Sequence, residues 1–193
     1  MKRRRTAQHP DRLEALARQA TDYALHMMRT TGSVPATVIA DTDDGYVFCM
    51  PADLADEAAK DRFAEIARLL AVAQNARALV LVVEAWVKYA NAAGELDTNI
   101  PPSQSADRKE VVALMLEDHS RAASSLLPIL RDGAGTFLAF DSPPAVDYTE
   151  SAGRFAGLMP RLKPSVREAA AAKASLLAMG MNIVNRGADP SLN

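Results

Sequence analysis

The chain has 193 residues, of which 49% are hydrophobic and 24% charged, and its formal net charge is −2. These values are typical of one globular domain with a buried core, and they exclude a disordered or collagen-like chain. They leave no large basic field for nucleic acid or an anionic membrane, and the one cysteine, Cys49, excludes an internal disulfide and a cysteine-rich zinc site.

The N-terminus carries a basic tetrad at residues 2–5, but no apolar stretch follows it, so a secretion signal is not supported. The longest apolar run, 78–87, contains Glu84 and is far shorter than the roughly 20 residues that span a bilayer. We expect one cytoplasmic domain over 1–193 without a membrane segment, with 1–9 and 186–193 as flexible tails.

The first third of the chain predicts a helix, a hairpin and a second helix. Residues 11–29 repeat apolar side chains at helical spacing and end before Gly32. The segments 34–40 and 46–50 predict two strands joined at Asp43-Asp44-Gly45, because Asp-Gly accepts the positive φ values of a tight turn. Helical spacing returns over 53–74, where Asp53 or Asp56 can cap the N-terminus.

The middle of the chain predicts a sheet. Residues 78–89 form the strongest strand, and because both faces are apolar in its first half we expect it in the centre of the sheet. The polar segment 91–107 has no periodicity and predicts a long loop, either a lid over a site or an exposed insertion. Three further strands follow, at 109–117, 122–130 and 136–140.

The C-terminal part is expected to be mostly irregular from 141 to 163, with a helical turn or two around 151–158. A capping box at Ser165-Val166-Arg167-Glu168 then predicts a last helix. We expect its apolar face to consist of Val166, Ala170, Leu177, Met181 and Val184.

Short turns between neighbouring strands make them antiparallel, and no regular strand–helix alternation runs through the chain. The sequence therefore predicts an α+β fold, with a single antiparallel sheet of about six strands and flanking helices. Over about 34–141 the order of elements resembles that of profilin-like and PAS-like sensor domains. This likeness is one of topology and does not define a function.

Motifs of common enzymes and metal sites are missing. The sequence contains no phosphate-binding glycine loop, no nucleophile elbow and no zinc-protease motif, and the three histidines do not converge. Asp41-Thr42-Asp43-Asp44-Gly45 is superficially like a calcium loop, but Ala52 stands where the bidentate glutamate belongs, so we interpret it as a turn. Cys49 has no neighbouring base and is interpreted as a buried structural residue. We expect no metal and no cofactor.

One polar group remains as a candidate ligand-binding site. Alternation places Glu84, Trp86 and Lys88 on one face of their strand, and Arg108 and Glu110 begin the next strand. Arg108 or Lys109 are candidates to pair with the Glu84 carboxylate. Two interpretations stay open: an ion-pair ladder that aligns the strands, or a polar patch with a tryptophan platform that binds a small polar ligand or a peptide beneath the 91–107 loop.

The same segment carries a resemblance. A Glu-Ala-Trp strand, a proline-containing loop and Asp-Arg-x-Glu-Val-Val, over about 79–116, resemble a group of small uncharacterised bacterial and phage-associated proteins. That resemblance implies that the loop and its flanks matter, and it implies no activity.

The sequence thus favours a non-enzymatic binding or regulatory module. We expect a homodimer through the last helix, where Gly180 permits close approach, or through the 11–29 helix. The alternative is a small hydrolase or transferase that uses Glu84 and Glu110 as a carboxylate pair. A third hypothesis, nucleic-acid binding through the basic tetrad, is disfavoured by the overall charge.

Overall fold

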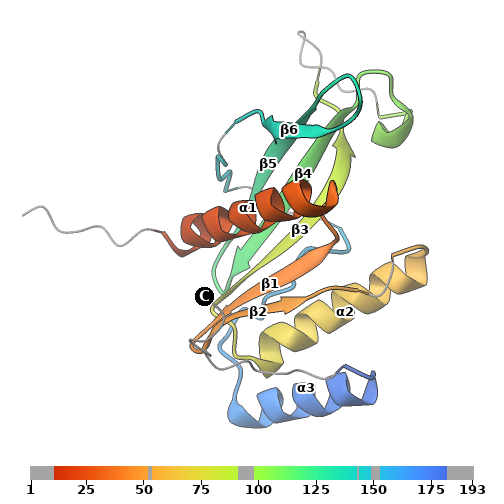
Figure 1. The fold of residues 1–193 in the computed structure, drawn as a ribbon. Coiled ribbons are helices and arrows are strands. Elements are labelled where there is room, and N and C mark those ends of the chain that lie inside the picture. The colour runs from red at the N-terminus through yellow and green to blue at the C-terminus, as the bar shows by residue number, and fades with distance from the viewer. Residues whose placement is uncertain (1–10, 52–53, 91–97, 143, 149–152, 182–193) are drawn as a thin grey trace, which may run out of the picture.

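A computed structural model describes residues 11–51, 54–90, 98–142, 144–148 and 153–181. It confirms the α+β fold: six antiparallel strands form one strongly curled sheet in the order β2-β1-β3-β4-β5-β6, with α1 and α2 against the sheet and α3 against α2 (Figure 1). In chain order the elements are α1 (Arg12–Thr31), β1 (Thr37–Thr42), β2 (Gly45–Cys49), α2 (Glu57–Ala73), β3 (Ala78–Val87), the short 3-10 helix η1 (Pro102–Gln104), β4 (Lys109–Asp118), β5 (Ala122–Arg131), β6 (Phe137–Phe140) and α3 (Val166–Ala178).

Helix α1 lies across one face of the sheet (Figure 1). Asp11 caps it by accepting the N–H of Leu13 at 2.9 Å, and Gly32 ends it at φ 77°. Its buried residues recur at the predicted helical spacing, from Leu13 to Met28. This face packs on alternate residues of the strands and forms one core, whose largest members are Leu13, Leu16, Met28, Ile39, Leu114, Leu116 and Leu127.

The second core lies on the opposite face of the sheet, under β1 and β3. Helix α2 packs there with α3, and Phe63, Leu79, Leu81 and Leu158 are fully buried between the layers. Asp56, one of the two predicted caps, begins α2 by accepting the N–H of Ala59 at 2.7 Å. Because both faces of β3 are covered in its first half, the prediction of a central strand is confirmed.

Helix α3 begins as predicted, because Ser165 and Glu168 form both halves of the capping box. The predicted apolar face is wrong for Val166, Ala170 and Leu177, whereas Met181 is partly buried against the second core. Ala172 and Leu176 are buried against the second core, whereas Val166 and Leu177 are exposed. An alanine-rich helix carries small apolar residues all round, so the neighbour decides which stripe is buried, and that neighbour is α2.

Gly180 follows the end of α3 with φ 81°, and an added Cβ would meet no atom of the chain within 4 Å. This glycine permits a left-handed helix end, where the N–H of Met181 donates to the carbonyl of Leu176. The expected close approach of a second copy at Gly180 stays a prediction. Val184 lies outside the described residues.

The segment between β6 and α3 is irregular, as predicted. Asp147 forms a bridge with Ser124 of β5, and 153–163 contains turns but no helix, so the expected helical turn is absent from the described part of 151–158.

Candidate functional site

The predicted ligand-binding residues gather at one end of the sheet. In the β3–β4 register Trp86 stands opposite Glu110 and Glu84 opposite Val112, so Glu84, Trp86 and Glu110 share the face on which α1 packs. Lys88 and Arg108 lie just beyond the strand ends. The expected juxtaposition of the five residues across the loop is therefore confirmed, and their role as ligand-binding residues stays a prediction.

Segment 98–108 folds back onto these strand ends. The Arg108 guanidinium lies over the Trp86 ring, 4.5 Å from its centroid, and donates to the Ser103 carbonyl. The Lys88 ammonium donates to the Ile100 carbonyl at 3.1 Å. The two cations thus hold the second part of the long loop, which contains η1, and residues 91–97 lie outside the described part.

We expect Arg108→Ala to change the emission of Trp86, the single tryptophan of the chain, while it lowers the free energy of unfolding by only about 0.5–1 kcal/mol. The cation–π contact is solvent-exposed, so its loss alters the environment of the indole more than the stability. Fluorescence spectra and urea denaturation measure the two effects. Lys109→Ala, one residue away and without this contact, is the control, and an unchanged Arg108→Ala spectrum contradicts the stacking.

The carboxylates of the site are paired differently from the prediction. Glu110 accepts two hydrogen bonds from Arg131 of β5, at 2.8 Å from Nε and 2.7 Å from Nη2. Glu84 accepts the backbone N–H of Val34, in the connection between α1 and β1. The prediction that Arg108 or Lys109 pairs with Glu84 is wrong. Arg108 stacks on the Trp86 indole instead, and the arginine that pairs with a carboxylate of the site is Arg131, which comes from a strand remote in sequence and binds Glu110.

The electrostatics follow from this pairing. The hydrogen bonds from Arg131 lower the pKa of Glu110, and Glu110, with a smaller effect of Glu84, raises the pKa of Arg131. A guanidinium–carboxylate fork between β4 and β5 aligns the two strands, and Glu84 fastens the α1–β1 connection to β3. These contacts favour the ion-pair interpretation of the cluster, with Arg131 as the partner that the sequence did not indicate.

Two other sequence features have structural roles. Cys49 is buried, and its burial raises the pKa of the thiol, which disfavours a reactive thiolate. Asp41 pairs with Arg77 at 2.7 Å, and Asp43-Asp44 forms the predicted hairpin turn. Within the described residues, no group of three histidine, cysteine or carboxylate side chains is placed to hold a metal ion. In the same part of the chain, no helix is long and apolar enough to cross a membrane.

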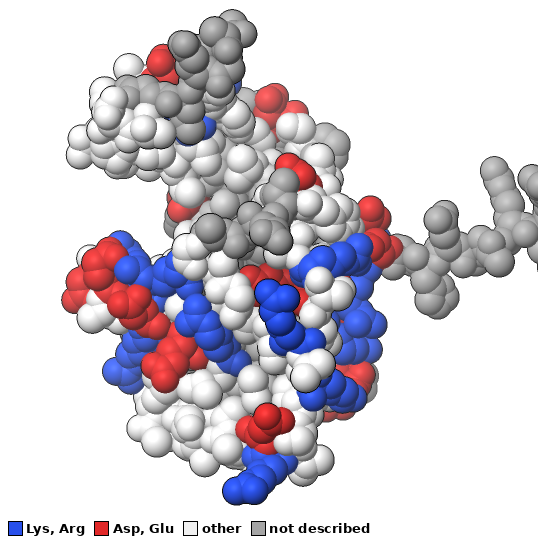
Figure 2. Space-filling model, turned by 180° about the vertical axis from the view of Figure 1, so that it is seen from behind, with Lys and Arg blue, Asp and Glu red and all other residues white. Residues whose placement is uncertain are grey.

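The charged surface is mixed. Seen from behind the view of Figure 1, basic and acidic side chains are interspersed over the half of the molecule that holds α2 and α3 (Figure 2). Arg154, for example, binds both Glu57 and Asp61. This face offers no continuous basic field, and the basic tetrad lies outside the described residues.

An apolar stripe on the edge strand β2 was missed by the sequence analysis. Tyr46, Phe48 and Met50 point to the same side and are all exposed, at 44%, 45% and 55%. Tyr23 of α1 contacts the stripe, with its ring centroid 5.6 Å from that of Phe48 and its hydroxyl near the sulfur of Met50. In the sequence, large apolar residues occupy every second position of Tyr-Val-Phe-Cys-Met, which places them on one face of a strand. The prediction used this segment only to define a strand.

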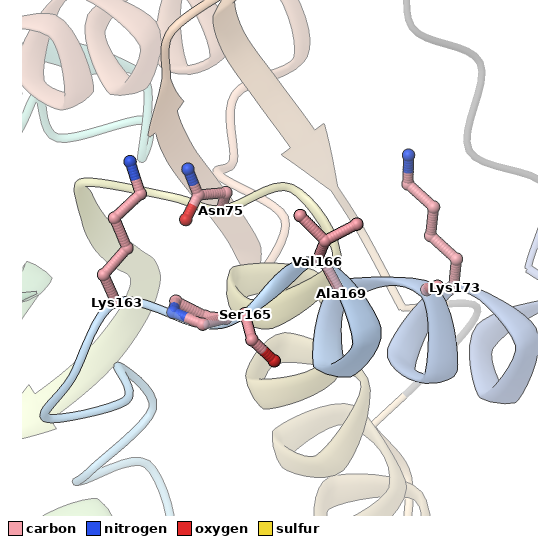
Figure 3. A pocket seen from close by; sticks show the side chains of 8 residues that line it. Asn75, Lys163, Ser165, Val166, Ala169 and Lys173 are labelled. Atoms are coloured by element: carbon pink, nitrogen blue, oxygen red, sulfur yellow. The ribbon is translucent and has the colours of Figure 1, made fainter.

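One cavity, of about 440 Å³, lies at the start of α3, with Lys163 and Lys173 on either side of Val166 among its lining residues (Figure 3). The Ser165 hydroxyl there is used in the capping box. A second cavity, of about 550 Å³, lies at the β4–β5 turn, at the opposite end of the sheet from Trp86.

Comparison of the chain with protein-family models, curated proteins and solved structures finds no match. The resemblance to uncharacterised bacterial and phage-associated proteins stays a prediction.

Proposed function

We propose that the chain is a non-enzymatic protein-binding module that pairs with a second copy of itself through the edge strand β2. The observation that carries this proposal is the exposed stripe of Tyr46, Phe48 and Met50 along a strand that has a neighbour on one side only. Large apolar side chains next to unpaired backbone groups are a template for a further strand.

The two edges of the sheet differ in a way that supports β2 as the binding edge. Strand β6 has four residues, its register shifts between Leu130 and Arg131, and the chain beyond it continues along β5 as far as Asp147. Short and bulged edges resist pairing. Strand β2 has five residues in regular register with β1 and contains no charged residue or proline.

A second copy in antiparallel orientation fits this edge, because a two-fold axis brings the same stripe to both sides. With Phe48 at the axis, Tyr46 of one copy stands opposite Met50 of the other, and the apolar stripe is continuous. The acidic turn at Asp43-Asp44 then lies about 26 Å from its counterpart, beyond the screening length of about 8 Å. Parallel pairing would set the two acidic turns side by side.

The helices offer less for an interface. The apolar face of α1 is used in the first core, and on α3 the exposed large apolar residues are Val166 and Leu177, near opposite ends of the helix. The enzyme alternative has no supporting observation, since a general acid needs a carboxyl group of raised pKa and Arg131 lowers that of Glu110.

Phe48→Lys tests the proposal, because it sets two like charges together at the axis. We expect the wild-type chain to have twice its mass of 20.7 kDa in solution, and the dissociation constant to rise at least about tenfold in the variant. Sedimentation velocity over a concentration series measures both. Leu138→Lys, at a 61% exposed position on the other edge, is the matched control and should leave the dimer intact.

Thermal unfolding shows whether Phe48→Lys is folded, and Tyr46→Lys gives a second variant of the stripe. A wild-type chain that stays monomeric at about 100 μM contradicts the proposal. So does an equal effect of Phe48→Lys and Leu138→Lys on the dimer.

A further inference from the structure

The cavity of about 550 Å³ at the β4–β5 turn lies between that turn and segment 157–160, which is distant in the chain and is hydrogen-bonded to side chains of the turn. Glu117, only 7% exposed, accepts the N–H of Gly157 at 2.7 Å and of Met159 at 2.9 Å, one with each carboxylate oxygen. His119 donates from Nδ1 to the Pro160 carbonyl at 2.7 Å. Segment 157–160 is thus attached at three points, and Arg161, which follows it, is held at the cavity wall.

The carboxylate acceptors of this cavity are already occupied. Both oxygens of Glu117 are used on the backbone. Asp118 accepts the N–H groups of Ser120 and Arg121, the hydroxyl of Ser120 and Nε of Arg121. This cavity therefore offers no free carboxylate to a ligand that has only hydrogen-bond donors.

The arginine side chains of this cavity, in contrast, have hydrogen-bond donors that are not all used within the chain. Arg161 is one of the residues that line the cavity, and its guanidinium makes no hydrogen bond or ion pair with any residue in the described part of the chain. Arg121 uses Nη2 on Asp11 at 2.6 Å and Nε on Asp118, and its guanidinium lies over the Tyr148 ring at 4.9 Å. The Tyr148 ring and the Met159 side chain add an apolar wall.

We infer that this cavity binds a small monocarboxylate, with the carboxylate on Arg161 and an apolar body against Tyr148 and Met159. A guanidinium presents paired donors that match a carboxylate, and the volume lies within the range of small-molecule sites. Asp11 and Asp118 are both paired with Arg121, which leaves Arg161 as the cation of this cavity available to a ligand carboxylate.

Titration of the full-length, ¹⁵N-labelled chain with sodium butyrate, followed by amide NMR shifts, tests the inference. We expect saturable shifts at residues 117–122 and 157–161, and none with butyramide, which lacks the negative charge that Arg161 is proposed to bind. Arg161→Gln should weaken butyrate binding about tenfold or more, because it removes charge-assisted hydrogen bonds. Arg167→Gln, an exposed arginine of α3 with no hydrogen bond or ion pair to a described residue, should leave it unchanged.

A peptide ending in a free carboxylate and its C-terminal amide distinguish the source of the ligand. Binding of the free peptide but not the amide, tighter than that of butyrate, identifies a chain terminus; tighter binding of butyrate identifies a free acid. The inference is overturned if neither butyrate nor the free peptide shifts these amides, if butyramide binds as well as butyrate, or if Arg161→Gln binds butyrate like the wild type.

Discussion

Glu117→Gln is expected to lower the free energy of unfolding by about 3 kcal/mol. Glu117 is the most deeply buried carboxylate among the described residues, and it accepts two backbone N–H groups, those of Gly157 and Met159. Glutamine keeps one acceptor oxygen but turns an amide NH₂ toward the other N–H, so one buried donor loses its partner. The segment that carries Leu158 into the second core is then held by fewer contacts.

Urea denaturation at neutral pH measures this loss, with Glu65→Gln on the exposed side of α2 as the matched control. The control should stay within about 0.5 kcal/mol of the wild type. If Glu117→Gln unfolds at the same urea concentration as the control, the carboxylate does not hold segment 157–159.

Arg131→Met is expected to lower the free energy of unfolding by about 2–3 kcal/mol at pH 7. It removes both hydrogen bonds to Glu110 and leaves that partly buried carboxylate without its counter-charge, close to Glu84. Arg131→Lys, which keeps the charge but not the two-pronged geometry, should recover part of the loss. Full recovery by lysine contradicts a role for the fork.

The loss of unfolding free energy caused by Arg131→Met should depend on pH in a defined direction. In the wild type Arg131 lowers the pKa of Glu110 below its value in the unfolded chain, so the pair stabilises the fold above about pH 4.5. That stabilisation is lost as the pH falls through the folded pKa. The difference between wild type and variant should therefore be largest at neutral pH and shrink toward pH 3, and a constant difference across this range contradicts the assignment.

Periodicity in the sequence was sufficient for most of the fold, because local patterns determine α1, the Asp43-Asp44 turn and the central position of β3. It was also sufficient to bring Trp86 and Glu110 together, since two strands joined by one loop pair in antiparallel register. It could not identify Arg131 as the partner of Glu110. That contact depends on the β4–β5 register and on the burial of one face, which no local pattern contains.

The same limit explains the error in α3 and the omission of the β2 stripe. An alanine-rich helix has no strong periodicity, so contact with α2, and not the sequence of α3, selects Ala172 and Leu176 for burial. The exposure of Phe48 depends on β2 being an edge strand, a property of the sheet order. Arg161 likewise reaches its cavity through contacts of Glu117 and His119 with a segment about 40 residues away in the chain.

Amide hydrogen exchange of the wild-type chain at low and high protein concentration tests the proposed β2 interface most directly. If two copies pair along β2, exchange of the outward-facing amides of 46–50 slows as the dimer forms, in an alternating pattern, because only every second N–H of an edge strand points to the new partner. The amides of β6 should exchange at the same rate at both concentrations. Exchange at 46–50 that does not depend on concentration while the mass doubles, or a chain that does not associate at all, contradicts the interface.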